Sequence, residues 1–165
     1  MIVNGLILKL LKLFSKKIQT IILTGIQASG KTTFYLKFFF DTHVHISLDK
    51  LNTRHKEQRF MQVCFETQSK FVVDNTNSTK EDRKKYIDAA RQHKYKVVGY
   101  FFQSGLDAAL VRNAQRKGKK NIPKVGVLAT AKKLEIPDYT EGYDELYFVR
   151  IGEDGHFFIE KKDKT

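Results

Sequence analysis

The chain has 165 residues, of which 41% are hydrophobic and 29% are charged, as expected of one globular domain with a sizeable core. Its single cysteine, Cys64, excludes an internal disulfide, so no disulfide partner is expected and an intracellular, cytoplasmic protein is favoured. The 30 lysines and arginines outnumber the 18 acidic residues by 12, a balance typical of proteins that bind polyphosphates or nucleic acid.

The first 17 residues are mostly apolar and contain no acidic residue. Four residues at helical spacing form one narrow polar stripe, and they are Gly5, Lys9, Lys12 and Lys16. The uncharged stretch ends at Leu8, far short of the ~20 residues of a membrane span, and no small-residue cleavage site of a secretory signal follows. We therefore expect residues 1–17 to form an amphipathic extension packed on a domain of residues 18–165. Peripheral contact with a membrane surface, or docking to a partner, is the alternative.

The first apolar run, residues 20–25, leads into GIQASGKTT, which fits the pattern G-x-x-x-x-G-K-[ST] of a P-loop. Its glycines let backbone N–H groups turn around a β-phosphate, and the helix predicted over residues 31–40 directs its positive end at the anion. Lys31 would reach the β- and γ-phosphates, and the Thr32 hydroxyl would bind Mg²⁺. The three phenylalanines at residues 38–40 are expected in the core. ATP and Mg²⁺ are the predicted cofactors, with the nucleotide held by Gly25, Ile26, Gln27, Ala28, Ser29, Gly30, Lys31, Thr32 and Thr33.

The second apolar run, residues 43–48, is followed directly by Asp49. Apolar runs alternate with helix-length polar segments along the chain, which predicts right-handed βαβ units and a parallel sheet. Ligands bind at the carboxyl ends of such strands, so Asp49 is expected beside the P-loop. A carboxylate there accepts or orients the proton of an attacking hydroxyl, as γ-phosphoryl transfer requires. The alternative is that Asp49 only caps the next helix.

The third run, residues 70–74, ends at Asp74, where P-loop proteins often place a carboxylate near the metal. Asp74 is expected either to hold Mg²⁺ through water or to fix a basic residue of the acceptor site. Asn75 and Asn77 follow in a polar turn, and they either contact the acceptor or serve only as turn residues. A helix is predicted over residues 78–94, with a Ser-Thr pair at its start as the cap.

The segment after the fourth run, residues 95–102, is strongly basic, because eight lysines and arginines lie between Asp107 and Glu135 with no acid among them. Arg112 and Arg116 are four residues apart and therefore point the same way on a helix. Two guanidinium groups at that spacing clamp a transferring phosphoryl group and bind the ATP phosphates. The sequence KGKKNIP then breaks the helix, as a hinged lid would, although a solvated basic helix has the same composition.

The fifth run, residues 145–151, precedes GEDG and a second alternating run, which is a hairpin signal. The fold predicted is a three-layer α/β domain with a mostly parallel five-stranded sheet, a C-terminal antiparallel hairpin and a basic lid.

Four segments together resemble the polynucleotide kinase group of P-loop kinases: the P-loop, SLD after the second strand, VVDNTN after the third, and RN with a later arginine and proline in the lid. The resemblance covers roughly residues 20–150 and implies a P-loop kinase fold. It also implies transfer of the γ-phosphate of ATP to the 5′-hydroxyl of DNA or RNA. By this resemblance Asp49 is the general base, Lys31 and Thr32 bind phosphate and magnesium, and Arg112 and Arg116 are the lid arginines. The DNTN segment, residues 74–77, matches the acceptor-side turn, and EGYDE, residues 141–145, echoes an EGF pattern of the group.

The sequence departs from that group at one position. Many polynucleotide kinases have an arginine three residues after the base, to hold the 3′-phosphate of the acceptor, and this chain has Asn52 there. Arg54 or Arg59 would take that role, or the acceptor carries no such phosphate. Two other functions stay open: a kinase of a small metabolite, nucleotide sugar or tRNA-linked acceptor, and an ATP-binding regulatory switch docked through residues 1–17.

Overall fold

The structure is a computed structural model, and it describes residues 18–152 and 154–164. The expected extension over residues 1–17 lies outside this part. The described residues contain one six-stranded sheet, in the order β2-β3-β1-β4-β5-β6. The strands are β1 (Gln19–Thr24), β2 (Val44–Ile46), β3 (Phe71–Asp74), β4 (Lys96–Phe102), β5 (Glu145–Ile151) and β6 (Phe157–Lys161).

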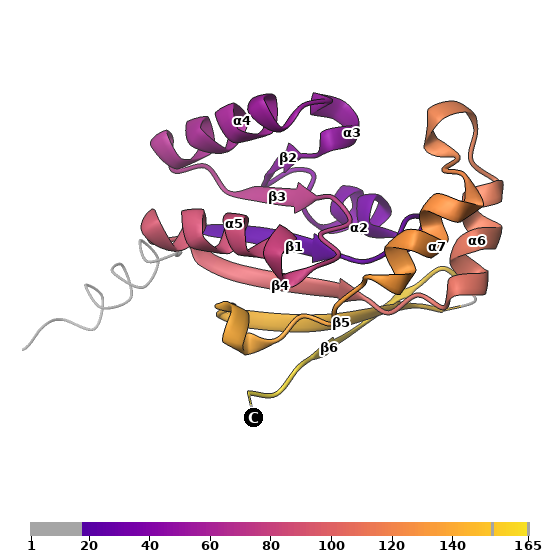
Figure 1. Ribbon diagram of the computed structural model, residues 1–165. Helices are drawn as coiled ribbons and strands as arrows, with labels where there is room; N and C mark the ends of the chain where they lie inside the picture. Colours follow the sequence, from indigo (N-terminus) through magenta and orange to yellow (C-terminus); the bar gives the residue numbers. More distant parts are fainter. Residues whose placement is uncertain (1–17, 153, 165) are drawn as a thin grey trace, which may run out of the picture.

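The first five strands are parallel, and β6 pairs antiparallel with β5, so the predicted parallel sheet with a C-terminal hairpin is confirmed. The helices are α2 (Lys31–Phe38), α3 (Leu48–Leu51), α4 (Arg54–Glu66), α5 (Lys80–Gln92), α6 (Leu106–Ala114) and α7 (Lys124–Lys132), with 3₁₀ turns η1 (Gly118–Lys120) and η2 (Tyr139–Glu141). In Figure 1, α4 and α5 lie in front of the sheet, α2 lies behind it, and α6 and α7 lie beyond the carboxyl ends of the strands.

The central strand β1 is buried from residue 20 to residue 24, and its middle residues Ile21, Ile22 and Leu23 are apolar, because helices cover the sheet on both faces. Ile22 points into a core cluster below α4 and α5, whereas Ile21 and Leu23 point into a second cluster below α2. These side chains are at most 1% exposed. The three-layer arrangement predicted from the alternation of apolar runs and polar segments is therefore present.

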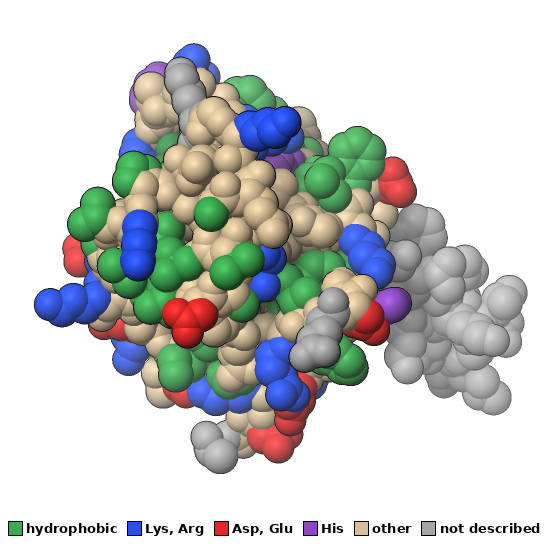
Figure 2. All heavy atoms as spheres, turned by 90° about the vertical axis from the view of Figure 1, so that its right-hand side faces the viewer, with side chains coloured by type: hydrophobic (Ala, Val, Ile, Leu, Met, Phe, Trp, Pro, Cys, Tyr) green, Lys and Arg blue, Asp and Glu red, His purple; other side chains and the backbone are tan. Residues whose placement is uncertain are grey.

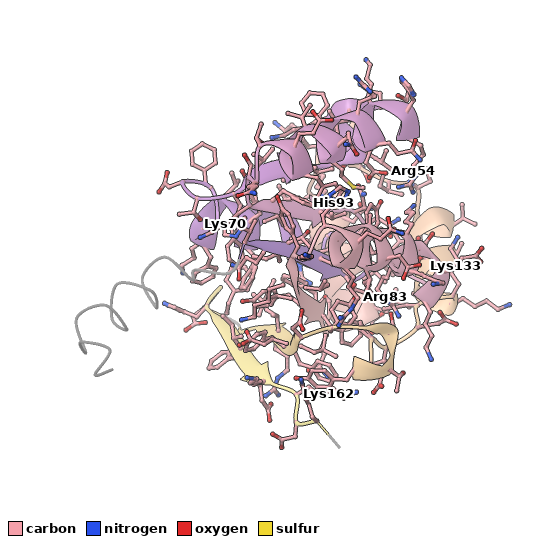
Figure 3. The ribbon with its side chains drawn as sticks, turned by 90° about the vertical axis from the view of Figure 1, so that its left-hand side faces the viewer. Arg54, Lys70, Arg83, His93, Lys133 and Lys162 are labelled. Atoms are coloured by element: carbon pink, nitrogen blue, oxygen red, sulfur yellow. The ribbon has the colours of Figure 1, made fainter. Side chains whose placement is uncertain are left out.

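The start of α5 is fixed by two kinds of contact that place the neighbouring turn. Thr79 is the N-cap, and it forms a reciprocal capping box with Asp82. Arg83, which is 0% exposed, makes two 2.7 Å hydrogen bonds to the Glu141 carboxylate. Its guanidinium also donates to the carbonyl oxygen of Asn77 at 3.0 Å. Figure 3 shows Arg83 between α5 and the chain that leads into β5, so one buried ion pair joins α5, η2 and the turn after β3.

The end of α2 differs from the expectation. The helix stops at Phe38 rather than at residue 40, and Phe38 and Phe40 are 43% and 62% exposed. The prediction that both belong to the core was wrong, because α2 ends where the described helices no longer cover this face of the sheet. Within residues 18–152 and 154–164, every helix is too short or too polar to cross a membrane.

Candidate active site

The loop between β1 and α2 adopts a conformation that depends on its glycines. Gly30 has φ of 96°, which disfavours other residues, and a Cβ built there would lie 2.4 Å from Cδ1 of Ile151. The backbone N–H of Gly25 donates to the carbonyl of Thr76 at 3.0 Å, which fixes the loop against the end of β3. Because α2 starts at Lys31, the free N–H groups of its first turn lie at this loop, as an anion site requires.

Lys31 lies at the centre of the loop and is buried. Its Nζ donates to the carbonyl oxygens of Gly25 at 2.8 Å and Ile26 at 2.7 Å. Burial lowers the pKa of Lys31 from its ordinary value of 10.5 to about 8, while the charge of Asp74 raises it, that of Arg116 lowers it and that of Asp49 raises it. Charged groups from three separate segments therefore act on one ammonium group, and this identifies the loop as the centre of a charged site.

Asp74 is held by contacts from two directions. Pairing of β3 with β1 places it next to Leu23, at the base of the P-loop. Its Oδ2 accepts hydrogen bonds from Thr32 Oγ1 at 2.7 Å and from His45 Nε2 at 2.9 Å. Burial alone would raise the pKa of Asp74, but the hydrogen bonds from His45 and Thr32 and the charge of Lys31 together lower it. The carboxylate is therefore ionised at neutral pH, although only 6% of the residue is exposed.

The residues around Thr32 fit a magnesium ion by their donor chemistry. Mg²⁺ prefers oxygen ligands and is usually bound through one or two protein groups together with phosphate oxygens and water. Because the Thr32 hydroxyl donates its proton to Asp74, its oxygen lone pairs remain available to a cation. Thr32 and Asp74, the predicted metal residues, are thus in contact with each other beside the P-loop.

Asp49 lies in the first turn of α3, directly after β2, and it is exposed. The N-cap residues of α3 and α4 are Ser47 and Thr53, so the alternative in which Asp49 only caps a helix is wrong. The turn is placed by Asn75, whose Oδ1 accepts from the backbone N–H of Leu48 at 2.9 Å. The negative charge of Asp49 raises the pKa of Lys31, so the Asp49 carboxylate lies within electrostatic reach of the P-loop lysine.

The other residues predicted on the acceptor side have different surroundings. Arg54 Nη1 donates to Glu57 Oε2 at 2.9 Å and to the Tyr86 hydroxyl at 2.8 Å, and Asn75 Nδ2 donates to Glu57 Oε1 at 2.7 Å. Arg54 and Asn75 thus meet at the buried Glu57, while half of the Arg54 side chain remains exposed. Asn77 is not brought to this cluster, because its buried amide donates to the carbonyl of Leu23 at 2.7 Å. Arg59 is exposed further along α4.

Of the two lid arginines, Arg112 contacts the P-loop directly, and Arg116 lies close enough for its charge to act on Arg112. Arg112 Nε donates to the carbonyl of Ala28 at 2.8 Å, and a second nitrogen contacts Ser104. Burial and the nearby charge of Arg116 lower the pKa of Arg112, and Arg116 also acts on Lys31. The helix break predicted at KGKKNIP is present, with η1 between α6 and α7.

Two features of the site carry no sequence motif. His45 contacts Asp74 and stacks on Tyr35 at 4.0 Å between ring centroids, yet histidines in an apolar run, here His43 and His45, are usually packing residues. A cavity of about 60 Å³ also lies beside the P-loop, at the ends of β4 and β5. It is lined by Ser29, Gln103, Ser104, Gly105, Ala108, Arg112, Val149 and Ile151. Only the pairing of β1, β4 and β5 brings these segments together, so the spacing of residues along the chain could not reveal it.

Comparison with solved structures defines the fold. Kti12 from Chaetomium thermophilum, in complex with ADP-AlF3, is 17% identical, with a TM-score of 0.61 over 79% of this chain and 88% of that one. A gluconokinase from Sinorhizobium meliloti is 16% identical, with a TM-score of 0.58 over 80% of this chain and 82% of that one. The chain therefore has the fold of the P-loop kinases.

Sequence comparison gives the family. The model of the AAA domain family AAA_33 matches residues 52–135, just over half of the 165 residues, and the chain belongs to this family. The bifunctional polynucleotide phosphatase/kinase of Schizosaccharomyces pombe is 25% identical over 132 residues, which are 78% of this chain and 32% of that protein. The chain spans about a third of the length of the curated relatives it matches. The resemblance to polynucleotide kinases seen in the motifs is confirmed.

Proposed function

We propose that this protein is an ATP-dependent kinase that transfers the γ-phosphate to a hydroxyl, and that this hydroxyl is the 5′-OH of a DNA or RNA strand. The observation that carries the proposal is the position of Asp49. It lies in the first turn of α3, directly after β2, and its charge and that of Arg116 both act on the pKa of Lys31. A candidate base for the acceptor and an arginine of the lid are thus both within electrostatic reach of the P-loop lysine.

Each residue then has a defined task in the transfer. The loop N–H groups and Lys31 bind the β- and γ-phosphates, and Arg112 and Arg116 neutralise charge on the transferring group. The acceptor oxygen attacks the γ-phosphorus, its proton passes to Asp49, and the bond from phosphorus to the β–γ bridging oxygen breaks to release ADP. Mg²⁺, held by Thr32 and Asp74, would neutralise phosphate charge when bound.

The cavity beside the P-loop supports the position of the nucleoside. Ser29 and Arg112 line both the cavity and the loop, so a triphosphate in the loop would extend its base towards the ends of β4 and β5. Together with the ADP-AlF3 complex of a protein with this fold, this favours ATP as the donor.

Three findings favour a nucleic acid as the acceptor: the name of the polynucleotide phosphatase/kinase relative, the net charge of +12, and the distribution of that charge. Figure 2, which faces the carboxyl ends of the strands and the lid, shows Lys and Arg side chains spread over this face among hydrophobic ones. Exposed lysines of the lid, such as Lys117, Lys120 and Lys124, and Arg54 on the opposite side, would contact backbone phosphates on either side of Asp49.

The test is transfer of labelled γ-phosphate from ATP to 5′-OH oligonucleotides, as single- and double-stranded DNA and RNA, with 5′-phosphorylated copies as the control. The proposal expects label on the 5′-OH ends alone, and a rate that falls steeply with added salt. Label found only on a small metabolite or nucleotide sugar from a parallel panel would support a kinase but contradict a nucleic acid as its acceptor. Binding of ATP with no transfer to either panel would favour a regulatory switch.

A further inference from the structure

The acceptor side contains one buried carboxylate that the proposed transfer does not use. Glu57 lies in the first turn of α4 and is 2% exposed, although a glutamate is rarely buried unless it is paired. Its Oε1 accepts hydrogen bonds from Asn75 Nδ2 at 2.7 Å and from the Tyr86 hydroxyl at 2.9 Å. Its Oε2 accepts from Arg54 Nη1 at 2.9 Å. Donors from α4, from α5 and from the turn after β3 therefore meet at this one group.

Stability alone does not account for a charge at this position. Moving a carboxylate out of water is costly, and an ion pair in the interior offsets that cost only when its geometry is good. An apolar side chain of similar size, packed among its neighbours, is often as stable or more stable. Apolar neighbours are present here, because Glu57 shares the buried face of α4 with Met61 and Phe65. The carboxylate at position 57 is therefore better explained by what its contacts hold in place.

The contacts of Glu57 lead through Asn75 to the turn that carries Asp49. Asn75 Oδ1 accepts from the backbone N–H of Leu48 at 2.9 Å, and Leu48 and Asp49 are the first two residues of α3. This helix has four residues, and its N-cap, Ser47, makes no side-chain hydrogen bond to it. Since the first N–H groups of a helix have no partners inside the helix, the Asn75 amide supplies the cap that α3 lacks.

The orientation of the Asn75 amide depends on Glu57. An asparagine amide has a donor end and an acceptor end, which exchange places when the group makes a half-turn. An ionised carboxylate only accepts, so Glu57 holds the donor end towards itself and leaves the acceptor end for the N–H of Leu48. We propose that Glu57 is a positioning residue, which orients Asn75 and thereby holds the turn that carries Asp49. The role of Asp49 in transfer rests on the proposed function, whereas the chain of contacts does not.

The second oxygen of Glu57 explains why the group is a carboxylate and not an amide. Arg54 Nη1, which donates to this oxygen, also donates to the Tyr86 hydroxyl at 2.8 Å. The Arg54 side chain is 51% exposed, and its Nε and Nη2 make no hydrogen bond within residues 18–152 and 154–164. Figure 3 shows Arg54 at the start of α4, the helix that follows α3. One carboxylate thus holds both the Asp49 turn and a guanidinium whose other donors are left for an acceptor phosphate.

Substitutions at position 57 separate the two contacts. Glu57→Gln keeps one oxygen, which Asn75 Nδ2 requires as its acceptor, but turns an amide donor towards Arg54, so it releases the guanidinium alone. Glu57→Met keeps an unbranched side chain of similar size but removes both oxygens, so the Asn75 amide is no longer held. Glu66→Gln removes the same charge from an exposed position at the end of α4 and is the matched control.

Amide hydrogen exchange, measured by NMR, tests the position of the turn without any kinase activity. The backbone N–H groups of Leu51 and Asn52 donate to the carbonyl oxygens of residues 47 and 48 within the turn. The proposal expects them to exchange about 10-fold faster in Glu57→Met, and within about twofold of the unchanged chain in Glu57→Gln and Glu66→Gln. Unchanged exchange in Glu57→Met would overturn it, and so would an equal increase in the central strand β1, which reports a loss of global stability. If Glu57→Met does not fold, Asn75→Ala takes its place, and unchanged exchange there would overturn the proposal.

The kinetics of the proposed transfer give a second readout. In Glu57→Met, kcat should fall about 10-fold while the KM for ATP changes less than about twofold, because the turn with Asp49 moves and the P-loop does not. In Glu57→Gln, kcat should stay within about threefold, and the KM for a 5′-OH oligonucleotide should rise about 5- to 10-fold. Equal losses of kcat in the two variants, or a parallel loss of ATP binding, would mean a merely structural role and overturn the proposal. If the unchanged chain transfers no phosphate, the proposed function fails, and the amide exchange alone still decides whether Glu57 holds the turn.

Discussion

The donor side and the acceptor side of the site are built in different ways. On the donor side, Lys31 and Asp74 are 8% and 6% exposed, and Lys31 Nζ and Asp74 Oδ2 already have hydrogen-bond partners in the protein. On the acceptor side, Asp49, Arg54 and Arg59 are exposed. Buried, hydrogen-bonded groups are held in place before any ligand binds, whereas exposed charged side chains can adapt to ligands of different shape. The contrast explains why the residues indicate phosphate transfer more firmly than they indicate the acceptor.

The largest effect is expected from a substitution of Asp49, which tests whether the exposed acceptor side takes part in the reaction. Asp49→Asn removes the group proposed to take the acceptor proton, so kcat should fall about 10²- to 10⁴-fold while ATP affinity changes less than about twofold. The measurement pairs single-turnover transfer with the binding of a fluorescent ATP analogue. Asp41→Asn, at an exposed acid after α2, is the matched control and should leave both quantities unchanged. Full turnover by the Asp49 variant would reduce the acceptor side to a binding surface.

The next largest effect is expected in the lid, where a partly buried arginine and an exposed lysine are neighbours in the sequence. Arg116→Ala removes positive charge where the transferring phosphoryl group would lie, and kcat should fall about 10²-fold. Lys117→Ala removes the same charge from the next residue, which is exposed, and kcat should change less than about threefold. Equal losses in the two variants would mean that the lid acts by its total charge and not by one positioned guanidinium.

His45 tests whether the buried side is held in place by its own contacts. His45→Phe keeps a ring that stacks on Tyr35 but removes the hydrogen bond to Asp74. If His45 positions the metal-binding carboxylate, the affinity for Mg²⁺ in nucleotide binding should weaken about 10- to 100-fold. The readout is the Mg²⁺ concentration that gives half-maximal binding of the ATP analogue, and His43→Phe, on the same segment, is the control. An unchanged Mg²⁺ dependence would leave His45 with a packing role alone.

The sequence predicts the donor side well because its determinants are local. The P-loop pattern, the strand before it and the helix after it lie within residues 19–38, and an apolar run followed by an acid marks each neighbouring strand end. The contacts that complete the site are long-range. Gly30 lies against Ile151, and His45 reaches Asp74 only because β2 pairs with β3. Such pairs depend on strand order and register, which the spacing of residues along one chain does not encode.

The exposed phenylalanines at the end of α2 show where prediction of burial from the sequence fails. Their apolar character correctly marks a buried environment in most proteins, and the core was the natural prediction for them. Whether a particular apolar residue is covered depends on which other segment reaches that part of the sheet. Here the described residues supply α2 alone on that face, so Phe38 stays partly exposed.

The smallest effect expected concerns pH and again separates the two sides. Burial, and then the charge of Lys70, lowers the pKa of His43 from 6.5 to about 4. At a pH between about 4 and 6.5, His43 is protonated in the unfolded chain but mostly neutral in the folded one. The unfolded chain therefore binds more protons, and the free energy of unfolding increases as the pH rises. The contribution of His43 to stability is lost as the pH falls from about 6.5 towards 4. The chain should be about 1–2 kcal/mol less stable at pH 5 than at pH 7 from this group. Thermal unfolding at the two pH values measures the difference, and His43→Gln should reduce it because glutamine does not titrate. The Asp49→Asn variant should keep the full difference, since Asp49 is exposed and does not belong to the buried framework. Loss of the pH dependence in that variant would show that the two sides share one network.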